Sequence, residues 1–229
     1  YCPSRAGKHA QTFLGEWKGA LMVDDYVGYK ALFATGITEL ACWAHARRVF
    51  FDAHKASASP LAEEALRRMG EFYAIAATLR GLDDATRSIE RKHRLGAWLA
   101  VFKHWLDAAQ AQTLGNSGVR KAIEYTQRRW PALARVIEDD AYPIDNNPIE
   151  NAIRPIAVGR KNWLFAGSET AGQRAAAIMS LIATAKANGI EPHAWLTDVL
   201  TRLPTTKDRD IATLLPLADY RFTAQGEVG

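Results

Sequence analysis

The sequence lacks the features of several large protein classes. No apolar run reaches the roughly 18 residues of a membrane span, and the first residues, YCPSRAGKHA, lack the apolar core of a signal peptide. Only Cys2 and Cys42 are present, so one disulfide at most can form and a reducing cytoplasm is the expected location. Neither a phosphate-binding loop motif nor a dinucleotide fingerprint occurs. These absences argue against a membrane protein, against a disulfide-rich secreted protein, and against a protein that binds nucleotides through either of these two motifs.

The positive charge of the chain is small and local. The 229 residues are 48% hydrophobic and 24% charged, which is ordinary for a globular protein, and the net charge is +4. Residues 151–190 hold five Lys or Arg side chains against Glu169 alone, so this stretch accounts for the whole excess. It indicates either a surface that binds nucleic-acid phosphates or a solvated basic face.

The first part of the chain, residues 1–58, is predicted to be mixed α/β. Two short apolar runs, GALMVDD at 19–25 and ITELACW at 37–43, have the length of buried strands and not of helices. Residues 9–17 and 44–56 have the spacing of helices.

The composition changes at residues 59–141, which are rich in Ala, Leu, Arg and Glu and have almost no strand signal. Pro60 suits the first turn of a helix, and Asp83 or Asp84 can cap the next one. We therefore expect an all-helical insertion of three to four helices, the last of them interrupted near Pro131.

Residues 142–189 are predicted to return to the core. The turn-rich string before Pro148 offers capping oxygens, so a short helix should begin there, carry Glu150 and end at Pro155. Residues 159–169 have the character of a loop or hairpin.

The end of the chain is predicted to be helical. Residues 172–188 have the small side chains and apolar spacing of a helix capped by Gly189. Residues 190–229 form a C-terminal helical element that begins at Pro192, followed after Pro204 by a tail without regular structure.

Two acidic residues are candidates for metal chemistry. Asp24 ends a predicted strand, where carboxylates commonly hold Mg²⁺, although it could simply open a turn. Glu150 lies at the start of a helix, where an acid also stabilises the helix dipole. Because Glu150 is followed by Arg154, Arg160 and Lys161, the region has the carboxylate and the basic side chains that phosphoryl transfer on DNA requires.

Other motifs carry weaker indications. Cys42 and His45 form the string CWAH, but two ligands fall short of the four of a structural zinc site. Trp163 would either stack on a nucleic-acid base or be buried.

Four ordered strings together resemble the transposases of the insertion sequence 66 family, from about Arg5 to Leu203. They are LMVDDYVGYKALF, ACWAHARRVFFDA, DNNPIENAIRPIAVGRKNWLFAGSE and SLIATAKANGIEPHAWLTDVL. The resemblance implies a helix-dominated α/β (α+β) fold, with a partial ribonuclease-H-like core that is interrupted by the helical insertion before the catalytic Glu.

The resemblance also assigns roles to single residues. Asp24 matches the second Asp of an Asp-Asp-Glu metal triad, and Glu150 matches the Glu. Asp25 stands where the family usually has Gly, which makes it a secondary candidate. Cys42 and His45 match a Cys-x-x-His signature and are expected to organise the core. The first triad Asp has no match, so we expect a fragment that lacks the N-terminal region and is inactive alone.

The implied chemistry is DNA transposition. In the intact enzyme, two Mg²⁺ or Mn²⁺ ions would be held by carboxylates, and water and then a 3′-hydroxyl would attack DNA. The partners would be double-stranded DNA, as transposon ends and target, and other transposase chains. We expect Arg154, Arg160 and Lys161 to contact the DNA backbone, and Asp145 and Asn146 to orient the site. The alternative is a non-catalytic remnant that binds DNA or oligomerises.

Overall fold

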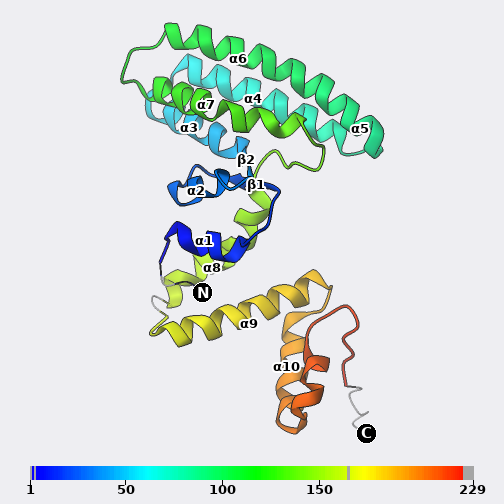
Figure 1. Cartoon of the computed structure of the whole chain (residues 1–229). Coiled ribbons are helices and arrows are strands. Elements are labelled where there is room, and N and C mark those ends of the chain that lie inside the picture. Colours follow the sequence, from blue (N-terminus) through cyan, green and yellow to red (C-terminus); the bar gives the residue numbers. More distant parts are fainter. Residues whose placement is uncertain (1, 3, 164–165, 224–229) are drawn as a thin grey trace. The chain divides into compact units, whose positions relative to one another are not determined.

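The computed structural model describes residues 2, 4–163 and 166–223, and for residues 160–163 the backbone alone. In chain order the elements are α1 (Gly7–Leu14), β1 (Ala20–Val23), η1 (Val27–Tyr29), α2 (Lys30–Phe33), β2 (Thr38–Ala41), α3 (Trp43–Ser57), α4 (Pro60–Leu79), α5 (Asp84–Glu90), η2 (Arg91–Leu95), α6 (Gly96–Ala111), α7 (Gly118–Ala134), η3 (Arg135–Ile137), α8 (Asn147–Trp163), α9 (Glu169–Ala187), α10 (Pro192–Arg202), η4 (Leu203–Thr205) and η5 (Asp208–Leu214) (Figure 1).

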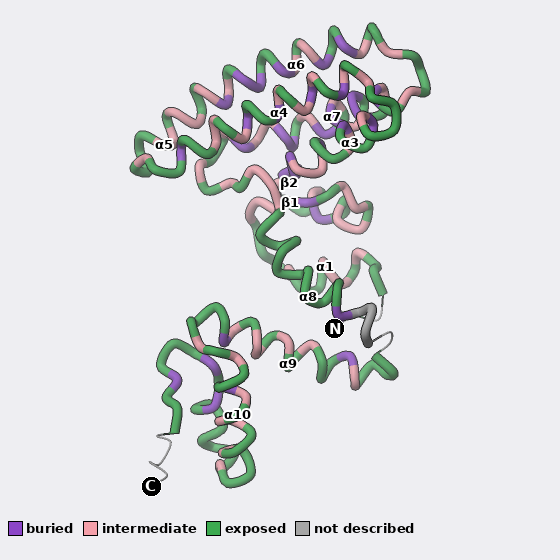
Figure 2. Tube along the Cα trace, turned by 180° about the vertical axis from the view of Figure 1, so that it is seen from behind, coloured by how far each residue is buried: buried purple, intermediate pink, exposed green. Residues whose placement is uncertain are grey.

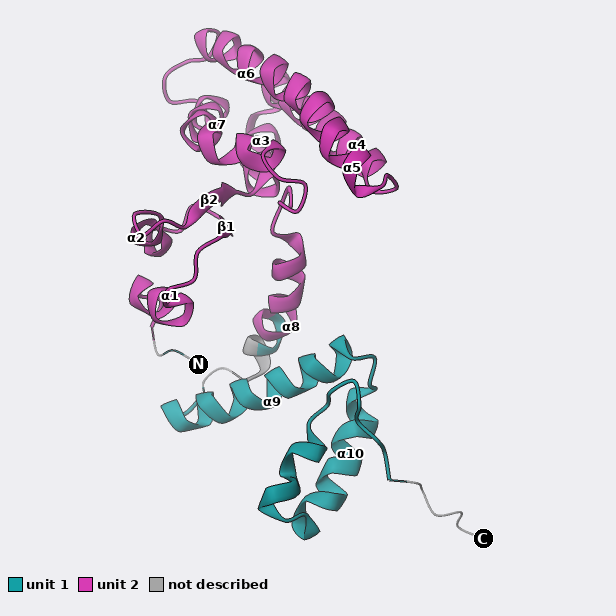
Figure 3. Cartoon of the chain, turned by 45° about the vertical axis from the view of Figure 1, so that its right-hand side comes forward, with its two compact units in different colours: residues 1–3, 158–229 teal, residues 4–157 magenta. Residues whose placement is uncertain are grey.

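Helices dominate, and the chain divides into two compact units (Figure 3). One unit is Ser4–Ala157, and the other holds Val158–Gly229 together with Tyr1–Pro3. Within the described residues, none of the helices has the length and apolar character needed to cross a membrane.

The sheet of the larger unit consists of two parallel strands, β1 and β2, which confirms both predicted strands. Ala20 pairs with Thr38 at one end of the register, and Val23 pairs with Ala41 at the other. Parallel strands need a crossover connection, and η1 and α2 provide it. Because the strands run the same way, the residues that follow Val23 and Ala41 emerge at the same edge of the sheet.

The core of the larger unit lies among helices α3, α4, α6 and α7, where buried residues concentrate (Figure 2). Trp43 is fully buried at its centre, with ring centroids 4.7 Å from Phe72 and 5.4 Å from Trp98. Its indole N–H donates to the carbonyl of Leu133 at 3.1 Å, so the polar atom of this large side chain is satisfied inside the core.

The helices predicted for residues 59–141 are present, with four α-helices in this range. Pro60 occupies the first turn of α4, the Asp83 carboxylate caps α5, and the Ser117 hydroxyl caps α7. The predicted interruption at Pro131 is wrong, because α7 runs through it to Ala134. A proline removes one backbone hydrogen bond, and burial of α7 against α3 and α6 keeps the helix continuous.

The predicted end of the next helix at Pro155 is also wrong. Helix α8 begins at Asn147, as the capping pattern indicated, but continues to Trp163. The predicted loop or hairpin at 159–169 is therefore helical over its first part, and residues 164–165 lie outside the described residues. The proline costs one hydrogen bond, whereas the bonds of its neighbours on both sides hold the helix together.

The smaller unit is built on α9, α10 and the segment after them. Trp195 is buried and donates its indole N–H to the carbonyl of Leu214 at 3.1 Å. The segment after Pro204, predicted to be irregular, contains the 3-10 helix η5, which packs through this hydrogen bond. Gly189 has a φ of 71°, the left-handed conformation predicted for the C-terminal cap of α9.

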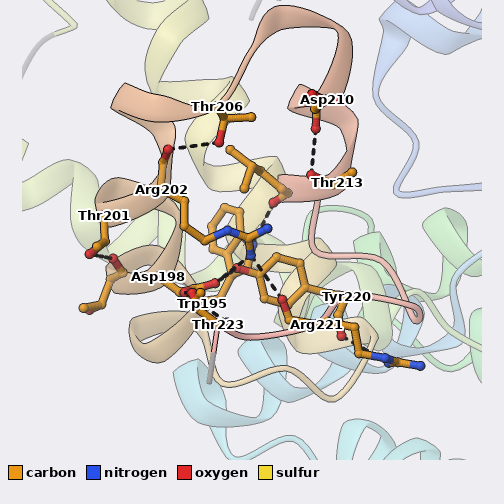
Figure 4. A network of polar contacts seen from close by, with 12 residues as sticks. Trp195, Asp198, Thr201, Arg202, Thr206, Asp210, Thr213, Tyr220, Arg221 and Thr223 are labelled. Carbon is orange, nitrogen blue, oxygen red and sulfur yellow. Dashed lines mark hydrogen bonds and ion pairs between the residues drawn. The ribbon is translucent and has the colours of Figure 1, made fainter. Parts of the chain in front are cut away.

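Asp198 is the centre of a hydrogen-bond network in this unit (Figure 4). Its carboxylate accepts from the Tyr220 hydroxyl at 2.5 Å, from the Arg202 guanidinium at 3.0 Å and from the Thr223 hydroxyl. Burial favours the neutral acid, but these donors outweigh it and lower the pKa of Asp198 from 3.8 to about 2. The carboxylate thus fastens the last described residues to α10.

We predict that the smaller unit loses stability as the pH falls from 3.8 to about 2, because protonation of Asp198 weakens these hydrogen bonds. Substitution Asp198→Asn should lower its melting temperature at neutral pH and flatten the dependence over this pH window. The indole N–H resonance of Trp195 in NMR spectra reports on this unit. An equally steep pH dependence in Asp198→Asn would contradict the prediction, and Asp208→Asn, on exposed η5, is the control.

Candidate functional site

Asp24 directly follows β1 and is exposed. Its Oδ1 accepts a hydrogen bond from the backbone N–H of Tyr26 at 3.1 Å, which closes a tight turn at the strand end. The carboxylate is thus fixed by its own backbone and remains accessible to solvent.

Cys42 occupies the corresponding position after β2. Since Val23 pairs with Ala41, Asp24 and Cys42 both follow paired residues and lie at the same edge of the sheet. The buried Cys42 thiol donates to Oδ1 of Asn146 at 3.0 Å, and the backbone N–H of Asn146 lies 3.4 Å from the Cys42 sulfur. The segment before α8 is therefore attached to the end of β2.

Asn146 connects this edge of the sheet to Glu150. Its side-chain amide nitrogen donates to Oε1 of Glu150 at 3.3 Å, in the first turn of α8. Asp145 accepts a hydrogen bond from the backbone N–H of Asn147 at 3.1 Å and helps to start the helix. A continuous series of contacts thus runs from the end of β2 to the Glu150 carboxylate.

Asp25, unlike Asp24, is held by ion pairs among the described residues. It has a φ of 80°, a backbone conformation that favours glycine. Its carboxylate pairs with Arg128 at 2.9 Å and with Arg129 at 3.2 Å, both on α7. Sequence reasoning missed these two arginines, because nothing in a helical RRW string shows that it reaches a turn about a hundred residues away.

Cys42 and His45 lie at the start of α3. Burial raises the pKa of the Cys42 thiol, against the opposing hydrogen bonds of Asn146 and of two backbone amides. Nδ1 of His45 is buried and has no hydrogen-bond partner among the described residues. Across the part of the chain that the structure describes, no group of three or more His, Cys, Asp or Glu side chains is placed to hold a metal ion.

The predicted DNA-contacting residues all belong to α8. Arg154 is exposed, one turn after Glu150. The side chains of Arg160, Lys161 and Trp163 lie outside the described residues, and their predicted roles stay predictions.

A cleft of about 670 Å³ opens beside the first turn of α8. On one side Arg91 donates to the carbonyls of Val136 at 2.6 Å and Asp140 at 3.2 Å, and also to that of Tyr142. Burial lowers the pKa of the Arg91 guanidinium. This arginine therefore holds the segment that leads from the insertion back to Asn146. The cleft is lined by Tyr73, Ala76, Leu79, Arg80, Arg87, Arg91, Asp140, Ala141, Tyr142, Pro143, Ile144, Asp145, Asn147, Pro148 and Asn151.

Two carboxylates thus have defined positions: Asp24 follows a parallel strand, and Glu150 is held by an amide that is bound to the end of the neighbouring strand. The family model described as "Transposase IS66 family" matches residues 1–174, and that described as "IS66 C-terminal element" matches residues 180–217. The chain belongs to the IS66 transposase family.

Curated relatives are similar over most of this chain. The uncharacterized protein y4hP of Sinorhizobium fredii is 34% identical over 96% of this chain and 43% of its own length. The uncharacterized protein y4qI of the same organism is 38% identical over 83% of this chain and 37% of its own length. The chain thus spans less than half the length of these relatives. No solved structure matches it.

The contact between Cys42 and Asn146 gives a testable prediction. At pH 8, iodoacetamide should modify the exposed Cys2 at least about tenfold faster than the buried Cys42, because burial suppresses both access and thiolate formation. Substitution Asn146→Ala should increase the rate at Cys42, and peptide mass spectrometry measures both sites in one sample. Substitution Asn188→Ala, in the other unit, serves as the control. An unchanged rate at Cys42 in Asn146→Ala would show that Asn146 does not cover the thiol.

Proposed function

We propose that this chain supplies part of a metal-dependent phosphoryl-transfer site for DNA transposition. The observation that carries the proposal has two parts: Asp24 and Cys42 follow paired residues of neighbouring strands, and contacts run from Cys42 through Asn146 to Glu150. It gives a physical reason for two acids 126 positions apart in the sequence to act at one site.

The donors at this edge fit Mg²⁺ or Mn²⁺ in their chemistry. Both are carboxylates, and divalent cations of this kind prefer oxygen ligands and retain several waters. Asp24 and Glu150 are exposed, so an ion would reach them without displacing packed side chains. The pair is an incomplete set, because no third acid joins them within the described residues.

In this proposal Asp24 and Glu150 hold the metal, with two ions in the intact enzyme. The bound ions would activate the attacking group and stabilise charge on the reacting phosphate. Asn146 orients the Glu150 carboxylate, and Asp145 fixes the start of α8. Arg154 lies one turn beyond and would contact a DNA phosphate, as would Arg160 and Lys161 further along α8.

We further propose that the two strands belong to a ribonuclease-H-like core completed by other parts of a longer protein. The relatives are more than twice as long as this chain, which leaves room for a third carboxylate and further strands. Double-stranded DNA, other transposase chains and a cytoplasmic location follow from the family as proposals. The 229-residue chain alone would then lack strand-transfer activity.

The metal proposal predicts that this chain binds Mn²⁺ weakly and that Asp24→Asn and Glu150→Gln each weaken binding at least about tenfold, through loss of a ligand. Electron paramagnetic resonance titration measures the affinity. Asp52→Asn, an exposed acid on α3, is the matched control and should leave binding unchanged. The chain should give no strand transfer with Mg²⁺. Robust transfer would show that another acid completes the site, and Mn²⁺ binding that ignores both substitutions would refute the assignment.

A second function is a non-catalytic part that binds DNA or oligomerises. The incomplete set of acids in the described residues favours it for this chain taken alone. The catalytic and the DNA-binding functions both use the basic residues of α8. A test of DNA binding therefore separates these two functions from a purely oligomerising role.

If α8 contacts the DNA backbone, affinity for a duplex should fall steeply with salt. Arg154→Gln should weaken binding to all sequences alike and reduce the slope of log K against log salt by about 1. Lys55→Gln, an exposed base on α3, is the matched control. Fluorescence anisotropy over a salt series measures the slope. Affinity that does not change with salt would exclude phosphate contacts and leave the oligomerising role.

A further inference from the structure

Helix α7 of the insertion reaches the turn that carries Asp24. Arg129 is buried, with an exposed fraction of 7%, and its Nη1 lies 3.2 Å from the Asp25 carboxylate. The same Nη1 donates to Oε1 of Glu39 on β2 at 2.5 Å. One guanidinium group therefore joins the turn after β1 to the neighbouring strand.

Arg135 provides a second attachment from the same part of the insertion. Its Nη1 donates to the backbone carbonyl of Glu39 at 2.7 Å. The side chain and the backbone of Glu39 are thus both held by arginines from α7 and η3. Strand β2 is fixed against this helix, so a displacement of Asp25 relative to β2 would have to break the contact with Arg129.

Arg129 makes these contacts with part of its hydrogen-bonding capacity unused. Its Nε and Nη2 are buried and have no hydrogen-bond partner among the described residues. Buried donors of this kind are costly, and a buried ion pair contributes little net stability compared with apolar packing. The contribution of Arg129 is therefore better accounted for by the geometry it imposes than by the stability it adds.

The turn after β1 that Arg129 contacts has a backbone conformation that its residues do not favour. Asp25 has a φ of 80° without being glycine, so its backbone conformation depends on contacts made by its side chain. Asp24, the preceding residue, presents its carboxylate from the same turn through the hydrogen bond from Tyr26.

We propose that Arg129 is a positioning residue for Asp24: by holding Asp25 against Glu39, it sets the turn in the conformation that presents the Asp24 carboxylate. The helical insertion thereby acts on the candidate metal site through α7. This inference rests on the proposed function for the role of Asp24, whereas the effect on the turn itself does not.

The test compares two adjacent arginines. Arg129→Gln removes the buried link, whereas Arg128→Gln removes an ion pair of the same carboxylate from a side chain that is 63% exposed. The first readout is hydrogen exchange of the Tyr26 amide by NMR, which reports on the turn. The second is Mn²⁺ affinity, measured with the metal alone.

We expect Arg129→Gln to speed exchange at Tyr26 about tenfold and to weaken Mn²⁺ binding about tenfold. Arg128→Gln, which breaks an exposed pair, should change either by less than about threefold. Arg129→Lys keeps a positive charge next to both carboxylates, so it should retain part of the protection at Tyr26 and part of the Mn²⁺ affinity. Equal behaviour of folded Arg129→Gln and Arg128→Gln in the exchange measurement would overturn the proposal.

A second variant keeps the test decisive if Arg129→Gln does not fold. Asp25→Asn tolerates the φ of 80° much as Asp does and leaves the contact between Arg129 and Glu39 in place, but it removes the charge that pairs with Arg129. It should still speed exchange at Tyr26, and unchanged exchange would overturn the proposal. If the unmodified chain bound no Mn²⁺, the metal assignment would fail, while the exchange data would still decide whether Arg129 sets the turn.

Discussion

Trp43 holds together the parts of the larger unit on which the candidate site is built. Its backbone N–H donates to the carbonyl of Ile144 at 3.1 Å, and its indole N–H donates to the carbonyl of Leu133. Its ring is buried against Phe72 and Trp98. The first residue of α3 therefore fixes the insertion, the strand end and the segment that returns to α8. Because close-packed cores resist displacement, Cys42 and Asn146 meet on a rigid base.

Three buried or partly buried arginines supplement this packing with directional hydrogen bonds. Arg91 binds carbonyls of the returning segment, while Arg129 and Arg135 bind the side chain and backbone of Glu39. Desolvation of a guanidinium group offsets much of the energy gained from such contacts. Their planar donor groups nevertheless specify where each acceptor must lie. The helical insertion is thus attached at two places. Arginines of α7 and η3 bind strand β2, and Arg91 of η2 binds the segment before α8.

The two acids of the proposed site share one kind of environment. Asp24 and Glu150 are exposed acids: Asp24 accepts from the backbone N–H of Tyr26, and Glu150 accepts from the half-buried Asn146, which is bound to the buried Cys42. An exposed carboxylate is accessible to ions, whereas the surrounding contacts limit its movement. The same division of roles applies to the acids of the turn after β1, since Asp25 is engaged by arginines and Asp24 is left open to solvent.

The local elements could be predicted from the sequence alone. Both strands, the helical insertion, the start of α8 near Pro148 and the cap at Gly189 follow from apolar periodicity, capping oxygens and glycine conformation, which act over a few residues. Local rules failed at Pro131 and Pro155, where hydrogen bonds on both sides outweighed the single bond that a proline removes.

The contacts around the candidate site, in contrast, depend on tertiary packing. The four strings of the family pointed to Asp24 and Glu150, but the contacts that hold the turn and the segment around these acids join residues about 90 to 104 positions apart. Nothing in the chain near Arg129 distinguishes it from other helical arginines. Such pairs form because packing around Trp43 brings α7 and the returning segment to the ends of the strands. Local sequence patterns do not encode contacts between residues so far apart in the chain.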